Sequence, residues 1–172
     1  DAAVSETEVR EAILGFVGEY AQVPPMYSAL KVNGKKLCDL AREGKTVERK
    51  ARKIKILEIT IDQIALPFVT MTVTCSKGTY IRTLCADIGK ALGCVGRMTE
   101  LLRIAAGSLS LENAIKLDDL KALAEQERAE EALLTMQEAL RDFPVIKIAE
   151  GSTKLLYNGG KIQEKYFTKQ PK

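Results

Sequence analysis

Tyr80 and Arg82 form the chemically most suggestive pair in the sequence, within the run CSKGTYIRT. Arg82 points off an apolar helical stripe while its neighbours are core residues, and a half-buried guanidinium ion needs a carboxylate or phosphate partner. The ring of Tyr80 can stack on a base or simply pack with its hydroxyl satisfied. The run therefore predicts an anionic partner for Arg82 and leaves both roles of Tyr80 open.

A second candidate is the segment PPMYSALKVNGKK, in which Tyr27 precedes Lys31, Lys35 and Lys36. From residue 31 to residue 55 there are ten basic and three acidic residues, a local charge of +7 within a chain of net charge +3. An aromatic ring offers a stacking face and lysines offer phosphate contacts, a combination that suits RNA. The alternatives are a surface loop packed on its own prolines and an ordinary solvated face.

Several classes of chemistry are excluded by composition. The chain has no histidine, which removes Ser-His-Asp and Cys-His catalysis and the commonest zinc ligand. Its four cysteines form no C-x-x-C pair, so we expect buried, reduced thiols rather than a zinc or redox motif. Phosphate-binding glycine motifs are also missing.

The elements that must position these residues can be recognised from local patterns. Ser5 and Glu8 form a capping box that predicts a helix with an apolar stripe at Val9, Ile13, Phe16 and Val17. Two strands are predicted, over 54–61 and over 69–75, the second with a threonine face. The turn 76–79 then leads into a helix that Gly93 ends.

The remaining segments show weaker patterns. Residues 20–50 look mostly irregular, with a short extended piece at 28–32 and a turn at Asn33-Gly34. We expect 101–111 to return to the sheet as an extended segment and 118–142, with eight acids and three bases, to be helical. A strand at 145–148, a short helix and a polar tail follow. No apolar run is long enough to cross a bilayer, and the N-terminal residues do not look like a signal peptide.

Three blocks of the sequence closely resemble the TruB family of tRNA pseudouridine-55 synthases. They are PPMYSALKVNGKKLCDLAREG, CSKGTYIRTLCADIGKALG and MTELLRIAAGSLSLENAI, in the order and with the spacing of the family, and the resemblance covers about residues 9–120. The block DFPVIKIAEGSTKLLYNGGKI resembles the entry into a PUA-type RNA-binding domain. Cys38 departs from the family where an aromatic residue is expected.

This resemblance implies an enzyme that detaches uracil from its ribose in the T loop of tRNA, rotates it and rejoins it through carbon, with no cofactor or metal. By the same resemblance, Tyr80 contacts the flipped base, Arg82 pairs with the catalytic aspartate and Leu101 packs over the base. We expect RNA contacts from Tyr27, Lys31, Lys35, Lys36, Arg42 and Lys77. A stand-alone RNA-binding module and an α+β interaction domain are the alternatives.

The catalytic aspartate of the family lies in a G-x-L-D-P-type motif upstream of the proline-tyrosine block, and no aspartate here has that flank. We therefore expect these residues to be a portion of a longer synthase that binds RNA without turnover. A naturally short relative is the alternative. Asp87 is rejected as a replacement, because five residues place it near the opposite face of the helix from Arg82.

The predicted architecture is α+β, a mixed and mostly antiparallel sheet with helices on one face. Residues 1–120 are expected to be the C-terminal part of the catalytic domain, 121–142 an acidic helical connector, and 143–172 the truncated start of a PUA-like domain. An exposed sheet edge predicts self-association. The composition predicts a soluble, cytoplasmic protein, and the resemblance implies that its partner is the T-arm of tRNA.

Overall fold

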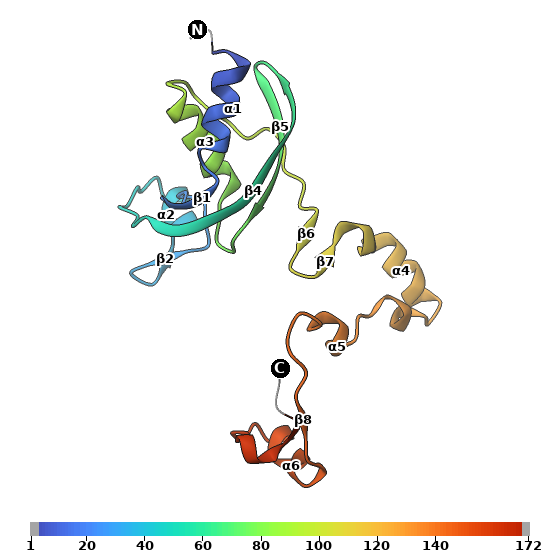
Figure 1. Cartoon of the computed structure of the whole chain (residues 1–172). Coiled ribbons are helices and arrows are strands. Elements are labelled where there is room, and N and C mark those ends of the chain that lie inside the picture. The colour runs from blue at the N-terminus through green and yellow to red at the C-terminus, as the bar shows by residue number, and fades with distance from the viewer. Residues whose placement is uncertain (1–3, 170–172) are drawn as a thin grey trace. The chain divides into compact units, whose positions relative to one another are not determined.

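The computed structural model describes residues 4–169 and divides the chain into two compact units, Asp1–Leu101 and Leu102–Lys172 (Figure 1). Unit 1 contains α1 (Glu6–Leu14), β1 (Gly18–Gln22), β2 (Lys31–Val32), β3 (Lys35–Lys36), α2 (Leu37–Arg42), β4 (Arg52–Ala65), β5 (Phe68–Cys75) and α3 (Ile81–Ala91). Unit 2 contains β6 (Ala105–Ala106), β7 (Leu109–Ser110), η1 (Leu111–Asn113), α4 (Leu117–Glu125), η2 (Ala129–Ala132), α5 (Met136–Ala139), β8 (Lys147–Ile148), η3 (Glu150–Ser152), α6 (Thr153–Tyr157), η4 (Glu164–Tyr166) and β9 (Phe167–Lys169), where η marks a 3₁₀ helix.

Helix α1 begins as its capping box predicts. The Ser5 hydroxyl accepts a hydrogen bond from the Glu8 N–H, and the Glu8 carboxylate accepts one from the Ser5 N–H at 2.8 Å. The apolar stripe was predicted to continue to Val17, but the helix ends at Leu14. Val17 is exposed in the turn that follows. Phe16 still packs against the core, where its ring meets Tyr20 edge to face.

A three-stranded antiparallel sheet of order β1-β4-β5 forms the frame of unit 1. The alternation predicted for β5 is confirmed, since Thr70, Thr72 and Thr74 are exposed and the residues between them are partly buried. Strand β1 was not predicted from the sequence. Its residues, GEYAQ, lack an apolar alternation and become a strand by pairing with the first residues of β4. The sheet edges are β1 and β5, and self-association through an edge stays a prediction.

The core of unit 1 lies between this sheet and the helices α1 and α3. Its buried cluster joins Val9 and Ile13 of α1, Ile54, Ile56 and Ile59 of β4, and Leu84 and Ile88 of α3. Helix α3 spans the residues that its apolar spacing predicts, and Gly93 follows it with a φ of 68°. The α+β class, with helices packed on a sheet whose strand pairs are antiparallel, is confirmed.

The segment expected to be irregular holds a hairpin and a helix. Asn33 and Gly34 both have positive φ, 50° and 82°, which is the geometry of the tight turn that their sequence predicts between β2 and β3. Helix α2 was not predicted, although Leu37 and Leu40 are buried at helical spacing. This hairpin and helix carry most of the lysines predicted to contact RNA.

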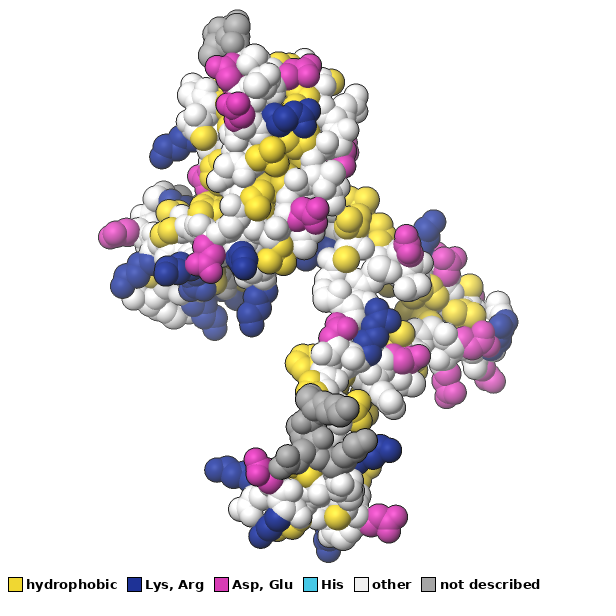
Figure 2. Space-filling view, in the orientation of Figure 1, with side chains coloured by type: hydrophobic (Ala, Val, Ile, Leu, Met, Phe, Trp, Pro, Cys, Tyr) yellow, Lys and Arg dark blue, Asp and Glu magenta, His cyan; other side chains and the backbone are white. Residues whose placement is uncertain are grey.

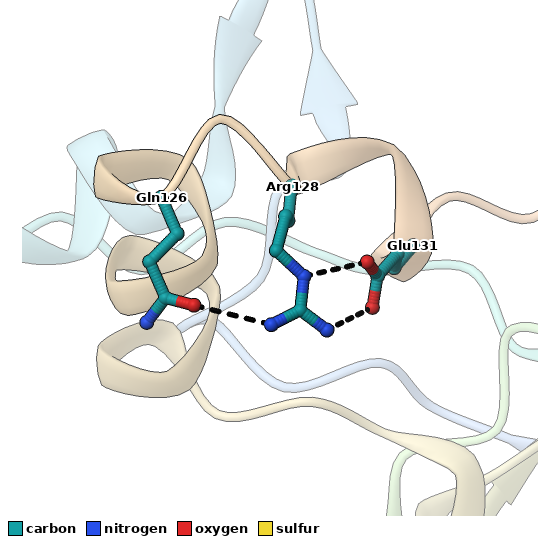
Figure 3. A network of polar contacts seen from close by, with 3 residues as sticks. All are labelled: Gln126, Arg128 and Glu131. Carbon is teal, nitrogen blue, oxygen red and sulfur yellow. Dashed lines mark hydrogen bonds and ion pairs between the residues drawn. The ribbon is translucent and has the colours of Figure 1, made fainter.

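Unit 2 corrects two predictions. Strands β6 and β7 pair with each other around Gly107 and do not return to the sheet of unit 1. The predicted helical stretch 118–142 is broken into α4, η2 and α5, because Glu127 has a positive φ of 60° and Thr135 caps a new helix. Arg128 stabilises the break by donating to Glu131 at 2.7 and 2.8 Å and to Gln126 at 3.2 Å (Figure 3).

The strand predicted in the C-terminal segment is shorter than expected. Of the strand expected over 145–148, Lys147 and Ile148 form β8, which pairs with β9. The short helix predicted after it is α6. The last three residues of the expected polar tail, 170–172, lie outside the described residues.

Three further observations bear on chemistry. All four cysteines are free. The expectation of buried thiols is wrong for Cys94, which is exposed, and the other three are only partly buried. Within residues 4–169 no three His, Cys, Asp or Glu side chains come together as a metal site. None of the helices in the same range is long and apolar enough to cross a membrane.

Candidate active site

The start of α3 presents the two residues that the sequence singles out. Tyr80 is the N-cap of α3, with an extended backbone at φ −104° and ψ 105°, and its side chain is partly buried. Arg82 is the second residue of the helix and is exposed, so the expectation of a half-buried guanidinium is wrong. Its place in the first turn, off the face that buries Leu84 and Ile88, keeps it out of the core.

Arg82 contacts the other candidate segment. Its Nη2 donates a hydrogen bond of 3.0 Å to the main-chain carbonyl of Tyr27, which lies 55 residues earlier in the chain. Within the described residues no carboxylate lies within 4.0 Å of this guanidinium. The structure therefore brings the two sequence candidates together, but through a carbonyl and not through the anion that charge balance predicts.

Two residues that the sequence reasoning missed hold this pair of segments. Gln22, 1% exposed, exchanges two side-chain hydrogen bonds with the backbone of Tyr80. Arg49 donates from Nη1 to the carbonyl of Pro24 at 3.1 Å, while its Nε is buried and has no partner among the described residues. Gln22 lies two residues before the Pro-Pro pair of the candidate segment, which could have drawn attention to it. The local sequence does not show that its amide binds the backbone of Tyr80.

Asp87 lies on α3, five residues after Arg82. Burial raises the pKa of its carboxyl, and the nearby Lys90 opposes that rise. Burial also raises the pKa of Tyr20, whose hydroxyl accepts a hydrogen bond from Gln22 and which the charge of Asp87 also influences. Among the described residues, Asp87 makes no ion pair with Arg82.

A cationic surface covers β2, β3, α2 and the turn after α2. It is formed by Lys31, Lys35, Lys36, Arg42 and Lys45. All five side chains are exposed, and Figure 2 shows Lys and Arg side chains gathered over this part of unit 1. Lys31 and Lys36 stand directly opposite each other in the hairpin, an arrangement of like charges that costs stability. Such a repulsion is relieved when an anion binds.

Acidic residues neutralise this cationic surface in part. Glu43 lies 2.7 Å from Lys45 and 4.0 Å from Lys35, and these lysines lower the pKa of its carboxyl. Asp39 pairs with Arg42 at 3.3 Å. Over residues 4–169, Lys31 and Lys36 have no carboxylate within 4.0 Å, so their charges are available to a ligand.

The remaining predicted site residues lie on other elements. Tyr27 is 58% exposed in the loop that its carbonyl anchors to Arg82. Lys77 is exposed in the turn between β5 and α3. Leu101 is 58% exposed and ends unit 1. An aromatic ring and an apolar side chain left open in this way are available for a base to pack on.

Two family models match consecutive parts of the chain. The TruB family pseudouridylate synthase N-terminal domain matches residues 1–81, and the tRNA pseudouridylate synthase B C-terminal domain matches residues 82–143. The chain belongs to the TruB family. The boundary between the two TruB models falls between Tyr80 and Arg82, so each model contributes one residue of the pair at the start of α3.

Curated TruB-family relatives match nearly the whole chain. It is 47% identical over 163 residues to tRNA pseudouridine synthase B of Alkaliphilus oremlandii, covering 95% of this chain and 54% of the relative. The same-named protein of Burkholderia mallei is 44% identical over 171 residues, covering 99% and 56%. The chain thus spans about half the length of the curated relatives that it matches.

Solved structures show the same fold. A crystal structure of a Cbf5-Nop10-Gar1 complex matches with a TM-score of 0.79 and 27% identity, covering 99% of this chain and 49% of that one. The archaeal box H/ACA sRNP Nop10-Cbf5 complex matches with a TM-score of 0.72 at 24% identity, covering 95% and 46%. The TruB resemblance and the α+β architecture are confirmed, while the roles of the individual residues stay predictions.

Proposed function

We propose that this chain is part of a tRNA pseudouridine synthase that isomerises the uridine at position 55 in the T loop. The observation that carries the proposal is the contact between the two family blocks, in which the Arg82 guanidinium binds the carbonyl of Tyr27. This contact gathers an arginine and two tyrosines at one place in unit 1. The names of the curated relatives support the reaction.

In the proposed reaction Tyr80 contacts the flipped base, Leu101 packs over it and Arg82 pairs with the catalytic aspartate. A guanidinium carries five N–H donors, and the bond to Tyr27 uses one of them. Arg82 can therefore keep the Tyr27 segment in place while it also binds a carboxylate. The seven aspartates of the chain lack the flanking residues of the family nucleophile, so this chain alone is expected to bind RNA without turnover.

RNA binding is assigned to the cationic surface together with Tyr27 and Lys77. Reaching the glycosidic bond requires the uridine to leave the stacked loop, at a cost of a few kcal/mol. Phosphate contacts from Lys31, Lys35, Lys36 and Arg42 offset part of this cost, because they hold the T-arm against the protein. No cofactor or metal takes part in the proposed isomerisation.

We propose the domain limits on the same basis. Residues 1–120 belong to the catalytic domain, 121–142 form a connector and 143–172 begin a PUA-like RNA-binding domain. The second family model ends at residue 143, where the proposed third segment starts. The first compact unit ends earlier, at Leu101, because the small hairpin β6-β7 makes its own local pairs.

An RNA-binding module without catalysis is the second candidate. It is favoured by the described contacts of Arg82, whose partner among residues 4–169 is a carbonyl and not a carboxylate. Both candidates share the cationic surface. They differ in whether the complete gene product that carries these residues forms pseudouridine.

The test measures pseudouridine formation and binding on a T-arm RNA hairpin. We expect this chain to bind without forming product, and the complete gene product to do both. In that gene product Arg82→Ala should reduce turnover by at least about 100-fold and leave the affinity for the hairpin nearly intact. Product formed by this chain alone would show that one of its own carboxylates is catalytic, and unchanged turnover in the variant would remove Arg82 from the mechanism.

A further inference from the structure

Gln22 holds the backbone of Tyr80 by both of its polar groups. Its Oε1 accepts a hydrogen bond of 2.8 Å from the Tyr80 N–H, and its Nε2 donates one of 3.2 Å to the Tyr80 carbonyl. The two residues are 58 positions apart, and Gln22 is the last residue of β1. One amide side chain thus pairs with a single residue as a neighbouring strand would.

The orientation of this amide follows from its partners. A main-chain N–H can only donate and a main-chain carbonyl can only accept, so Oε1 must face the first and Nε2 the second. The second hydrogen of Nε2 is donated to the hydroxyl of Tyr20. With its donors used and 1% of its surface exposed, Gln22 is fixed in place and cannot touch RNA.

Tyr80 depends on this amide because of its place in the chain. As the N-cap of α3 it precedes the first helical turn, so its N–H has no helical acceptor. Tyr80 makes no side-chain cap bond at this helix end, and its carbonyl already accepts from Thr83 and Leu84. The amide of Gln22 supplies the missing acceptor and fixes the extended backbone from which the ring of Tyr80 projects.

A third hydrogen bond joins the same two segments, with its side chain on the other segment. Arg82, two residues after Tyr80, donates to the carbonyl of Tyr27, five residues after Gln22. Each segment therefore sends one side chain to the backbone of the other. The three bonds together fix Tyr80 and Arg82 relative to the loop that carries Tyr27.

We propose that Gln22 is a positioning residue for the active site, acting through the backbone of Tyr80. This inference rests on the proposed function, since it assigns to Gln22 the placement of the tyrosine and arginine that the isomerisation uses. The competing view is that Gln22 is merely a satisfied polar residue of the interior. That view predicts lost stability alone, whereas positioning also predicts a selective loss of turnover.

The first measurement follows hydrogen exchange of the Tyr80 amide by NMR in this chain. Gln22→Met keeps the side-chain length and removes both bonds, so the Tyr80 amide should exchange about tenfold faster. Gln22→Glu keeps an acceptor for that N–H and should protect it better than Gln22→Met. If Gln22→Met does not fold, the comparison of Gln22→Glu with the wild type still reports on the bond to the Tyr80 carbonyl through exchange of the Thr83 and Leu84 amides, which share that acceptor.

The second measurement separates kcat from KM for the T-arm hairpin in the complete gene product. Gln22→Met should lower kcat about tenfold and change KM less than about twofold. Ile13→Val is the matched control, because it weakens the core in α1 at a residue 1% exposed and contacts neither Tyr80 nor Gln22 through a hydrogen bond. At a temperature where all variants are folded, the control should keep both constants.

Three results would overturn the inference: unchanged Tyr80 exchange in folded Gln22→Met, an unchanged kcat in the same variant, or an equal loss of kcat in Ile13→Val. Failure of the proposed function is distinguishable from each of them. If the wild-type gene product forms no pseudouridine, the reaction assignment fails, whereas Tyr80 exchange still decides whether Gln22 fixes that backbone.

Discussion

The two units of the chain differ in how they bury their side chains. Every hydrophobic residue that is buried among the described residues lies in unit 1, on α1, α2, β4 and α3. In unit 2 the described residues bury one side chain, Ser152, and leave large apolar residues such as Leu102, Leu134 and Phe143 exposed. The residues proposed to perform chemistry thus rest on a packed frame, while unit 2 has local hydrogen bonds in place of a core.

The largest expected effect tests this contrast with one substitution made in both units. Leu84→Ala removes a side chain that is fully buried between α3 and the sheet, so we expect a loss of about 2–5 kcal/mol in the free energy of unfolding. Leu134→Ala removes the same atoms from a side chain 59% exposed, so the loss should stay below about 0.5 kcal/mol. Urea unfolding followed by circular dichroism measures both.

Equal losses for the two variants would contradict the contrast. They would mean that the apolar residues of unit 2 are buried in solution by something other than their own unit. A small loss for Leu84→Ala alone would instead show that the core of unit 1 collapses around the cavity, since the cost of such a cavity depends on how far its walls relax.

The same contrast explains what the sequence could and could not predict. The capping box of Ser5, the turn at Asn33-Gly34 and the length of α3 depend on residues within one or two turns of each other, and all three predictions are confirmed. Strand β1 forms because it pairs with β4, which begins 34 residues after the start of β1. No local sequence pattern predicts β1. In unit 2 the helix break at Glu127 was missed, because a positive φ at a glutamate follows no propensity rule.

The candidate site was predictable in its residues and not in its contacts. Family motifs identified Tyr27, Tyr80 and Arg82, and the structure brings their two segments together. Charge balance predicted a carboxylate or phosphate for Arg82, whereas the described partner is a carbonyl 55 residues away in the chain. Gln22 was missed for a related reason: a buried amide is specified by the backbone it meets, and that backbone belongs to a distant segment.

A second, smaller effect concerns the charges of the two units. Lys36 of the cationic surface faces Lys31 across the hairpin, so Lys36→Ala should lower the salt slope of T-arm hairpin binding by about one. Lys121 in α4 is also exposed but follows Asp118 and Asp119 in an acidic stretch, and Lys121→Ala should leave the slope unchanged. Fluorescence anisotropy at several salt concentrations provides the slopes. An unchanged slope for Lys36→Ala would make this surface an ordinary solvated face.

The smallest expected effect uses two capping boxes, one in each unit. Ser5 caps α1, which packs Val9 and Ile13 into the core, so Ser5→Ala should lower the free energy of unfolding by about 1 kcal/mol. Thr135 caps α5 with the same pattern of hydrogen bonds, but α5 has four residues and buries none of them. Thr135→Ala should therefore leave the unfolding of unit 1 unchanged.

The pH dependence of the Ser5 cap sharpens this last comparison. Hydrogen bonds from the Ser5 hydroxyl and N–H to the Glu8 carboxylate lower its pKa below the ordinary value. The folded state then binds a proton less readily than the unfolded state, so the contribution is present at neutral pH and disappears as the pH falls through the lowered pKa. Ser5→Ala should cost less at about pH 3 than at pH 7 in urea unfolding. A cost independent of pH would show that the cap acts through the Ser5 hydroxyl and the Glu8 N–H alone, with no part played by the carboxylate.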